Sequence, residues 1–155
     1  MTIADHDRIP EAARDWARAG KGAALATVVE TWGSAPRPVG SQLAISGDSE
    51  IMGSVSGGCV EGAVVVEALE ALEDGRCRML EFGVSDDEAF AVGLACGGRI
   101  RVMVEPVGHG QGAGQGIEPG LLDDLVAARA QRRAVAVVTD TGNWSREIAG
   151  PETDP

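Results

Sequence analysis

The sequence predicts a single α/β domain in which a mixed β-sheet is flanked by helices. Its 155 residues are the usual length of one domain and are enough to bury a single core. Segments with the apolar spacing of helices alternate along the chain with short, apolar, β-branched segments that are typical of strands. Two of the strand-like segments are separated by a short turn, which requires at least one antiparallel pair.

The first half of the chain is predicted to form a helix followed by three strands. Apolar residues recur at helical spacing from Ile9 to Ala17, and Gly20 ends this helix. Gly47-Asp48-Ser49 between two apolar runs indicates a hairpin. In chain order, the predicted elements are a helix over 9–17, a strand over 23–31, and hairpin strands over 41–46 and 51–55.

The second half is predicted to alternate helices and strands. The run Val64-Val65-Val66 favours a strand, but the apolar spacing around it and the stop at Gly75 favour a helix. The predicted elements are a helix over 59–72, a strand over 77–82, a helix or turn from 86, a strand over 99–105, a helix over 121–128 and a strand over 134–139. The expected organisation is a core over 1–107, a glycine-rich linker over 108–120, and a C-terminal helix, strand and frayed tail over 121–155.

Composition and charge argue against several classes of function. Thirteen basic and 24 acidic side chains give a net charge of −11, which disfavours nonspecific binding to nucleic acid or anionic membranes. No apolar run reaches the roughly 18 residues of a membrane-spanning helix, and the N-terminus lacks the pattern of a secretory signal. We therefore expect a cytoplasmic protein in which the three cysteines are reduced.

Two common functional signals do not match this sequence. The glycines between 108 and 116 all lie at even positions, whereas the dinucleotide-binding pattern GxGxxG needs an odd offset. His6 and His109 lie near the N-terminus and in the linker, so no Ser-His or Cys-His catalytic pair is indicated. A hydrolase is therefore disfavoured.

The first of three glycine-bounded loops spans 33–40 and contains one arginine. Arg37 lies between Pro36 and Pro38, and Ser34 adds a hydroxyl group. A guanidinium held in a stiff loop suits a phosphate or another oxygen-rich anion. The alternative is a proline-rich turn with a solvated arginine, and these residues alone do not decide between the two.

The second loop, GSVSGGCVEG at 53–62, joins a strand to a predicted helix. The amides of Ser56-Gly57-Gly58 could bind a phosphate at the helix N-terminus, whose dipole also favours negative charge. The same field would lower the pKa of the Cys59 thiol, and Glu61 would complement the dipole or accept hydrogen bonds from a ligand. Alternatively, the glycines form a turn, Cys59 is a small buried apolar residue and Glu61 only caps the helix.

The third loop, GLACGGR at 93–99, again places a cysteine beside paired glycines. Cys96 follows Cys59 by 37 residues, and the two elements together could frame one pocket. Cys77 lies within a predicted strand without such a setting, and we expect it to serve packing.

These motifs, in this order, resemble those of a known family. The segments ATVVETWGSAPRPVGSQLAIS, GSVSGGCVEGAVVVEAL and FGVSDDEAFAVGLACGGRIRVMVEPV, within Ala23 to Val107, are similar to the N-terminal domain of the XdhC/CoxI family. Members of this family are accessory proteins of molybdenum hydroxylases such as xanthine dehydrogenase and carbon monoxide dehydrogenase. The resemblance implies a chaperone that binds the molybdenum cofactor, as molybdopterin or its nucleotide form, protects it, and assists its sulfuration and insertion into a hydroxylase.

The resemblance also implies the partners and the site of a maturation factor without catalytic residues. Expected partners are a molybdenum hydroxylase apo-enzyme, a cysteine desulfurase and a separately encoded second domain, with neither nucleic acid nor membrane among them. Cys59 and Cys96 would approach molybdenum or its sulfur, because soft thiolates suit such a centre. Matched by motif, the cofactor-binding residues would be Gly33, Ser34, Pro36, Arg37, Ser56, Gly57, Gly58, Cys59, Glu61, Cys96, Gly97 and Gly98.

Two alternatives remain beside the chaperone. The first is a thiol-dependent enzyme that acts on a phosphorylated small molecule through Cys59, and the second is a structural module in which all three loops are turns. The net charge of −11 is compatible with an anionic ligand if the acids lie on outer helix faces, as expected for Glu67, Glu70 and Glu73.

Overall fold

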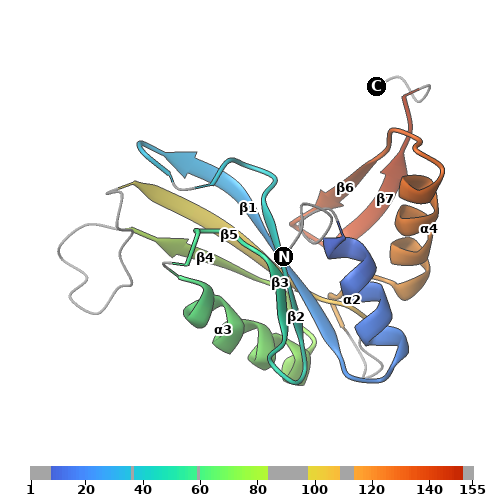
Figure 1. Ribbon diagram of the computed structural model, residues 1–155, viewed down its shortest axis with the longest axis horizontal. Helices are drawn as coiled ribbons and strands as arrows, with labels where there is room; N and C mark the ends of the chain where they lie inside the picture. The colour runs from blue at the N-terminus through green and yellow to red at the C-terminus, as the bar shows by residue number, and fades with distance from the viewer. Residues whose placement is uncertain (1–7, 36, 59, 84–97, 109–113, 152–155) are drawn as a thin grey trace.

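The structure, a computed structural model, describes residues 8–35, 37–58, 60–83, 98–108 and 114–151. Its elements are α2 (Ile9–Arg18), β1 (Ala23–Trp32), β2 (Gln42–Ser46), β3 (Ile51–Gly53), α3 (Glu61–Asp74), β4 (Arg78–Phe82), β5 (Arg99–Pro106), α4 (Pro119–Ala130), β6 (Ala136–Asp140) and β7 (Ser145–Ala149) (Figure 1). The predicted helices and strands within the described ranges are confirmed, with ends that shift by at most two residues. β7 was not predicted, and the helix or turn predicted from residue 86 lies outside the described residues.

Five strands form one sheet in the order β3-β2-β1-β5-β4. The predicted α/β class is confirmed, but every described strand pair is antiparallel where a mixed sheet was expected. The connection through α3 explains why no parallel pair forms. It joins β3 to β4, and these two strands run in the same direction but lie at opposite edges of the sheet, so they do not pair with each other. Among the described residues, parallel pairing is limited to the isolated bridge between Val107 and Ile117.

Helices cover both faces of the sheet, and each face has its own apolar cluster. Side chains alternate between the two faces along a strand, so Ala24 and Val28 of β1 face α3, whereas Ala23 and Leu25 face α2 and α4. Figure 1 shows α3 below the sheet and the α2–α4 pair beside it. The partners from the helices are Val64, Ala68 and Ala71 of α3 in one cluster, and Ile9 and Ala13 of α2 with Leu122 of α4 in the other.

A β-bulge changes the alternation near the end of β1. The pairing with β5 shifts between Val28 and Glu30, so that Glu30 lies opposite Arg101 and Trp32 lies opposite Arg99. The side chains of Glu30 and Trp32 therefore lie on the face of the sheet opposite α3. This face is exposed to solvent at this end of the sheet. Trp32 is 37% exposed, and the guanidinium of Arg99 lies 4.6 Å from the centre of its indole ring.

The C-terminal hairpin of β6 and β7 is attached to the sheet by one buried ion pair. Arg146 of β7 donates from Nε to Glu105 of β5 at 2.8 Å, and both side chains are almost fully buried. The same guanidinium donates to the carbonyls of Gln115 and Gly116 and to the sulfur of Cys77. The hairpin, the segment before α4 and the inner strand β5 therefore meet at Arg146.

Candidate functional site

Four strand ends lie at the same end of the five-stranded sheet, and the three predicted loops leave from them. The register pairs Trp32 at the end of β1 with Arg99 at the start of β5, and Phe82 at the end of β4 with Ile100. The end of β3, Gly53, points the same way because β3 runs parallel in direction to β1. Figure 1 shows these ends on the side of the molecule away from α4 and the C-terminal hairpin.

The first and third loops are in direct backbone contact. A side chain at Gly98 would place its Cβ 2.6 Å from the carbonyl carbon and oxygen of Ser34, and 2.9 Å from the amide of Ala35. Gly83 is packed equally closely against the carbonyl of Gly98. Gly98 therefore has to be a glycine for these loops to touch.

The described parts of the three loops pack against one buried apolar cluster. Ala35 of the first loop packs against the same buried cluster as Val55 and Val60 of the second loop. Phe82 and Ile100, which flank the third loop, belong to this cluster too. Among the described members of the predicted site, Gly98 contacts Gly33 and Ser34, and Glu61 contacts Ser56 and Gly58. The remaining described members are Arg37 and Gly57.

The second loop is organised around the carboxylate of Glu61, in the first turn of α3. One carboxylate oxygen, Oε2, accepts hydrogen bonds from the Ser54 hydroxyl at 2.7 Å and from the amides of Val55 and Ser56 at 2.9 and 3.0 Å. The other oxygen, Oε1, accepts from the Ser56 hydroxyl and from the amide of Gly58 at 3.0 Å. The amides that were predicted to face a phosphate are therefore bound by a carboxylate of the protein itself.

These contacts set the charge of Glu61. Burial raises its pKa, but the hydrogen bonds from Ser56, Ser54 and the backbone amides outweigh burial and lower the pKa from 4.5 to about 2. The carboxylate is therefore ionised at any physiological pH. Ser54, which sequence analysis missed, could have been recognised from two serines that precede paired glycines and a carboxylate on the next helix.

Arg37 provides an unused donor in the first loop. Its side chain is half-buried, and its Nε is shielded from solvent without a hydrogen-bond partner among the described residues. A buried donor without a partner is unfavourable, and a bound anion would satisfy it. This arrangement fits the predicted anion contact better than the alternative of a solvated arginine.

Four predicted site residues lie outside the described residues: Pro36, Cys59, Cys96 and Gly97. The pocket predicted between the two cysteines thus stays a prediction. Within the described ranges, no group of three His, Cys, Asp or Glu side chains is placed to hold a metal ion. Cys77 is packed against Gln115, and burial raises the pKa of its thiol to about 11, which agrees with a packing role.

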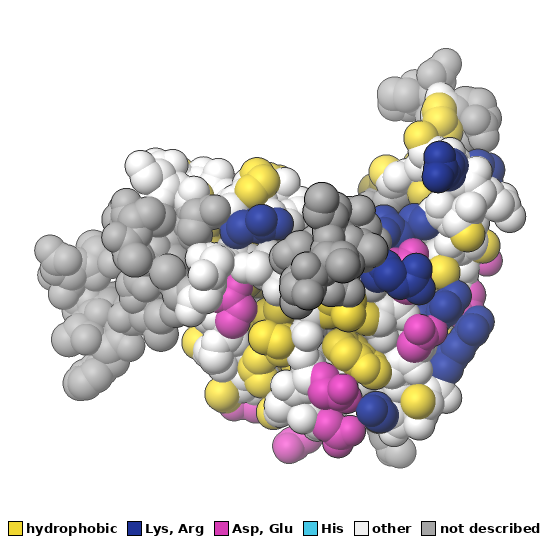
Figure 2. Space-filling model, in the orientation of Figure 1, with side chains coloured by type: hydrophobic (Ala, Val, Ile, Leu, Met, Phe, Trp, Pro, Cys, Tyr) yellow, Lys and Arg dark blue, Asp and Glu magenta, His cyan; other side chains and the backbone are white. Residues whose placement is uncertain are grey.

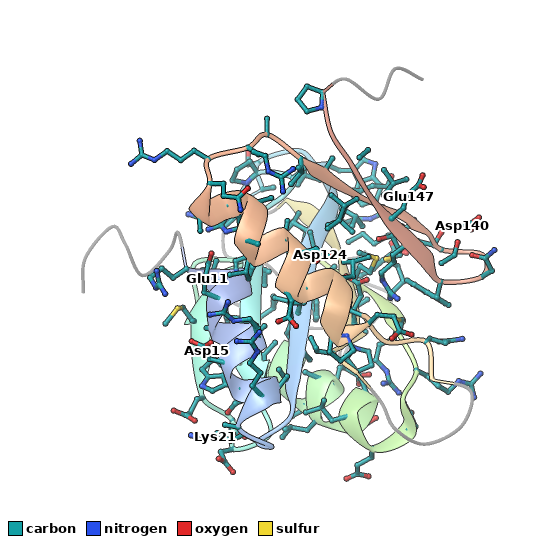
Figure 3. The ribbon with its side chains drawn as sticks, turned by 90° about the vertical axis from the view of Figure 1, so that its right-hand side faces the viewer. Glu11, Asp15, Lys21, Asp124, Asp140 and Glu147 are labelled. Atoms are coloured by element: carbon teal, nitrogen blue, oxygen red, sulfur yellow. The ribbon has the colours of Figure 1, made fainter. Side chains whose placement is uncertain are left out.

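Several of the described acidic side chains lie away from the loops, and Glu30 and Glu81, which lie beside the strand ends, form ion pairs with Arg101. Glu70 and Glu73 are exposed on α3, and Glu67 forms an ion pair with Arg78 at 3.3 Å. Figure 3 shows further acids, Asp124 among them, over α4 and the C-terminal hairpin, and Figure 2 shows acids along the lower edge of the molecule. The overall negative charge is therefore compatible with an anion at the loops, as expected. None of the described helices is both long and apolar enough to cross a membrane.

Comparison with known proteins identifies one family. Residues 16–83 match the XdhC and CoxI family. The chain is 40% identical over 107 residues to a protein of Escherichia coli K12 named molybdenum cofactor insertion chaperone PaoD, covering 69% of this chain and 33% of PaoD. It is 34% identical over 88 residues to a protein of Bacillus subtilis 168 named as a probable xanthine dehydrogenase subunit, covering 55% of this chain and 26% of that protein.

A solved structure supports the fold. A protein of Bacillus halodurans, described as a xanthine dehydrogenase, superposes with a TM-score of 0.57 at 23% sequence identity. The superposition covers 77% of this chain and 35% of that protein. The chain thus spans about one third or less of the length of these relatives.

Proposed function

Since residues 16–83 belong to the XdhC and CoxI family, we propose that this chain is a molybdenum-cofactor chaperone that assists maturation of a molybdenum hydroxylase. The likeness to PaoD, named an insertion chaperone, supports binding and delivery of the cofactor. The observation that carries the proposal is the packing of the described parts of three loops on one buried apolar cluster, together with the buried Arg37 Nε, which has no hydrogen-bond partner among the described residues. A maturation factor of this kind binds its cargo and releases it unchanged, apart from sulfuration by a partner.

The residues at the loops fit the chemistry of the cofactor, which supplies a molybdenum centre on a pterin dithiolene with a phosphate. Arg37 offers the planar donor set that matches a phosphate. Gly33 and Gly98 let two of the loops pack closely together, whereas Gly57 and Gly58, where a Cβ would meet no described atom within 4 Å, leave the backbone open to close approach by a flat ring. Cys59 and Cys96 would supply soft sulfur near molybdenum. We place Ser34, Pro36, Ser56, Gly57, Gly58, Glu61 and Gly97 in the walls of the same site.

We propose that the chaperone acts in the cytoplasm with three kinds of partner. An apo-hydroxylase receives the cofactor, a cysteine desulfurase provides the sulfur for its terminal ligand, and a separately encoded domain completes the factor. The likeness to a probable xanthine dehydrogenase subunit supports a hydroxylase of that type as the recipient.

Mass spectrometry of protein purified from a molybdenum-replete host tests this function. We expect a pterin to co-purify with the wild-type chain and with Arg133→Ala, which removes an exposed arginine after α4, but to be reduced with Arg37→Ala. Cys59→Ser should weaken retention of the pterin without loss of thermal stability. A substrate-derived adduct on Cys59 would instead establish the thiol enzyme, and a chain that retains neither would refute both.

A further inference from the structure

We propose that Glu61 is an internal anion that shapes the second loop, and that the anionic group of the ligand is bound at Arg37 of the first loop instead. The inference rests on the proposed function for the identity of the ligand. It assigns Glu61 as a positioning residue that does not touch the cofactor. The amides after β3 are then part of the wall of the site and are not a phosphate cradle.

The first support is that the carboxylate of Glu61 has no remaining acceptor capacity. A carboxylate has about four lone-pair sites, and five donors from Ser54, Val55, Ser56 and Gly58 already converge on its two oxygens. A hydrogen bond from a ligand would have to displace one of these. Glu61 is therefore poorly suited to the ligand contact that its position in the sequence suggested.

The second support is that the two serine hydroxyls extend the same network to the other amides. Each hydroxyl has one proton, which it donates to the ionised Glu61, so each can act only as an acceptor elsewhere. Ser54 Oγ accepts from the amide of Gly57 at 2.7 Å, and Ser56 Oγ accepts from the amide of Val60 at 2.8 Å. Every described amide from Val55 to Val60 thus has a partner inside the protein.

The third support is electrostatic. A phosphate at these amides would stand within hydrogen-bond distance of an ionised carboxylate, and the two like charges would repel each other in a partly buried site. Arg37 has the opposite sign and a buried donor that has no partner within the described part of the chain. The separation of tasks follows: Glu61 fixes the shape of the loop, and Arg37 holds the anion.

Chemical rescue of Glu61→Ala tests the internal anion directly. Removal of the carboxylate leaves several donors without an acceptor, so we expect the Tm to fall by about 5–10 °C. Added formate, a free carboxylate of the same kind, should restore much of this loss, whereas chloride at equal ionic strength should not. Glu73→Ala, which removes an exposed carboxylate from the last turn of α3, is the matched control and should not respond to formate. A Tm of Glu61→Ala that does not respond to formate would overturn the proposal.

Pterin retention on the same variants separates positioning from ligand contact. Leu122→Ala, which destabilises the other apolar cluster, serves as a variant of comparable Tm. We expect Glu61→Ala to lose more pterin than Leu122→Ala and to regain it with formate. If formate restores the Tm but not retention, Glu61 contacts the ligand and the proposal is wrong. If the wild-type chain retains no pterin, the proposed function fails, while the formate response of the Tm still decides the role of Glu61.

Discussion

The buried ion pair between Arg146 and Glu105 gives a quantitative test of how the C-terminal hairpin is attached. In Arg146→Met the aliphatic stem is largely kept, but Glu105 is left with a buried charge that has lost its partner. Removal of one partner from a buried pair typically costs about 3–5 kcal/mol. Small domains have only about 5–15 kcal/mol of stability in total, so the loss should be large. Four further acceptors, on Gln115, Gly116, Trp144 and Cys77, lose a donor as well.

The loss of folding stability caused by Arg146→Met should increase as the pH rises. Burial raises the pKa of Glu105, and the nearby charge of Arg146 partly offsets this rise. The Arg146→Met substitution should therefore raise the pKa of Glu105 further. A carboxyl group with a raised pKa in the folded state binds more protons folded than unfolded. Stability therefore falls as the pH rises above the unfolded pKa, and the difference from wild type should grow between about pH 4 and neutrality.

Urea unfolding followed by tryptophan fluorescence measures this effect, because Trp144 lies 5.8 Å from the Arg146 guanidinium. Arg99→Met is the control: its pair with Glu81 is exposed and should contribute only about 0–1 kcal/mol. A loss below about 1 kcal/mol for Arg146→Met, or a loss that is the same at every pH, would refute the reasoning.

Three further predictions concern single residues. After allowance for solvent screening, wild type should be more stable than Glu61→Gln by about 1–2 kcal/mol. Thermal melts should show this difference in stability above pH 4.5, and the difference should disappear as the pH falls to about 2. In Gly98→Ala the new methyl group would collide with the backbone of Ser34, so calorimetry should show a loss of about 1–3 kcal/mol; an unchanged Tm would contradict the contact. The Cys77 thiol, with its pKa raised from 9.0 to about 11, should react with iodoacetamide at pH 8 about 100-fold more slowly than a free thiol, and peptide mass spectrometry would detect faster labelling.

Local periodicity was sufficient to predict most elements but not their pairing. The Val64-Val65-Val66 run is helical because its members point in different directions: Val64 is buried, Val65 half-buried and Val66 exposed. β7 was missed because its buried residue is Arg146, whose partner Glu105 lies 41 residues away. The antiparallel sheet was missed for the same reason, since strand order depends on contacts between distant segments.

The sequence motifs located the loops of the candidate site but not their geometry. The spacing of the glycine motifs identified the loops, and the contact between Gly98 and the backbone of Ser34 agrees with their convergence. The sequence also placed Glu61 in the first turn of a helix. It could not show that the carboxylate turns back to the amides before that helix, because this direction depends on how α3 leaves β3.

The extra residue near Val29 makes the length of β1 as important as its composition. If the strand kept this residue but lacked the bulge, its side chains would alternate evenly, and Glu30 and Trp32 would turn to the α3 face of the sheet. A carboxylate and an indole would then be driven into the valine-lined layer above α3, whereas Thr31 would move out to solvent. Loss of the codon for Val29, which removes the bulge and leaves both side chains on their present face, should thus be less harmful than loss of a codon earlier in the strand, which turns buried residues to the opposite face.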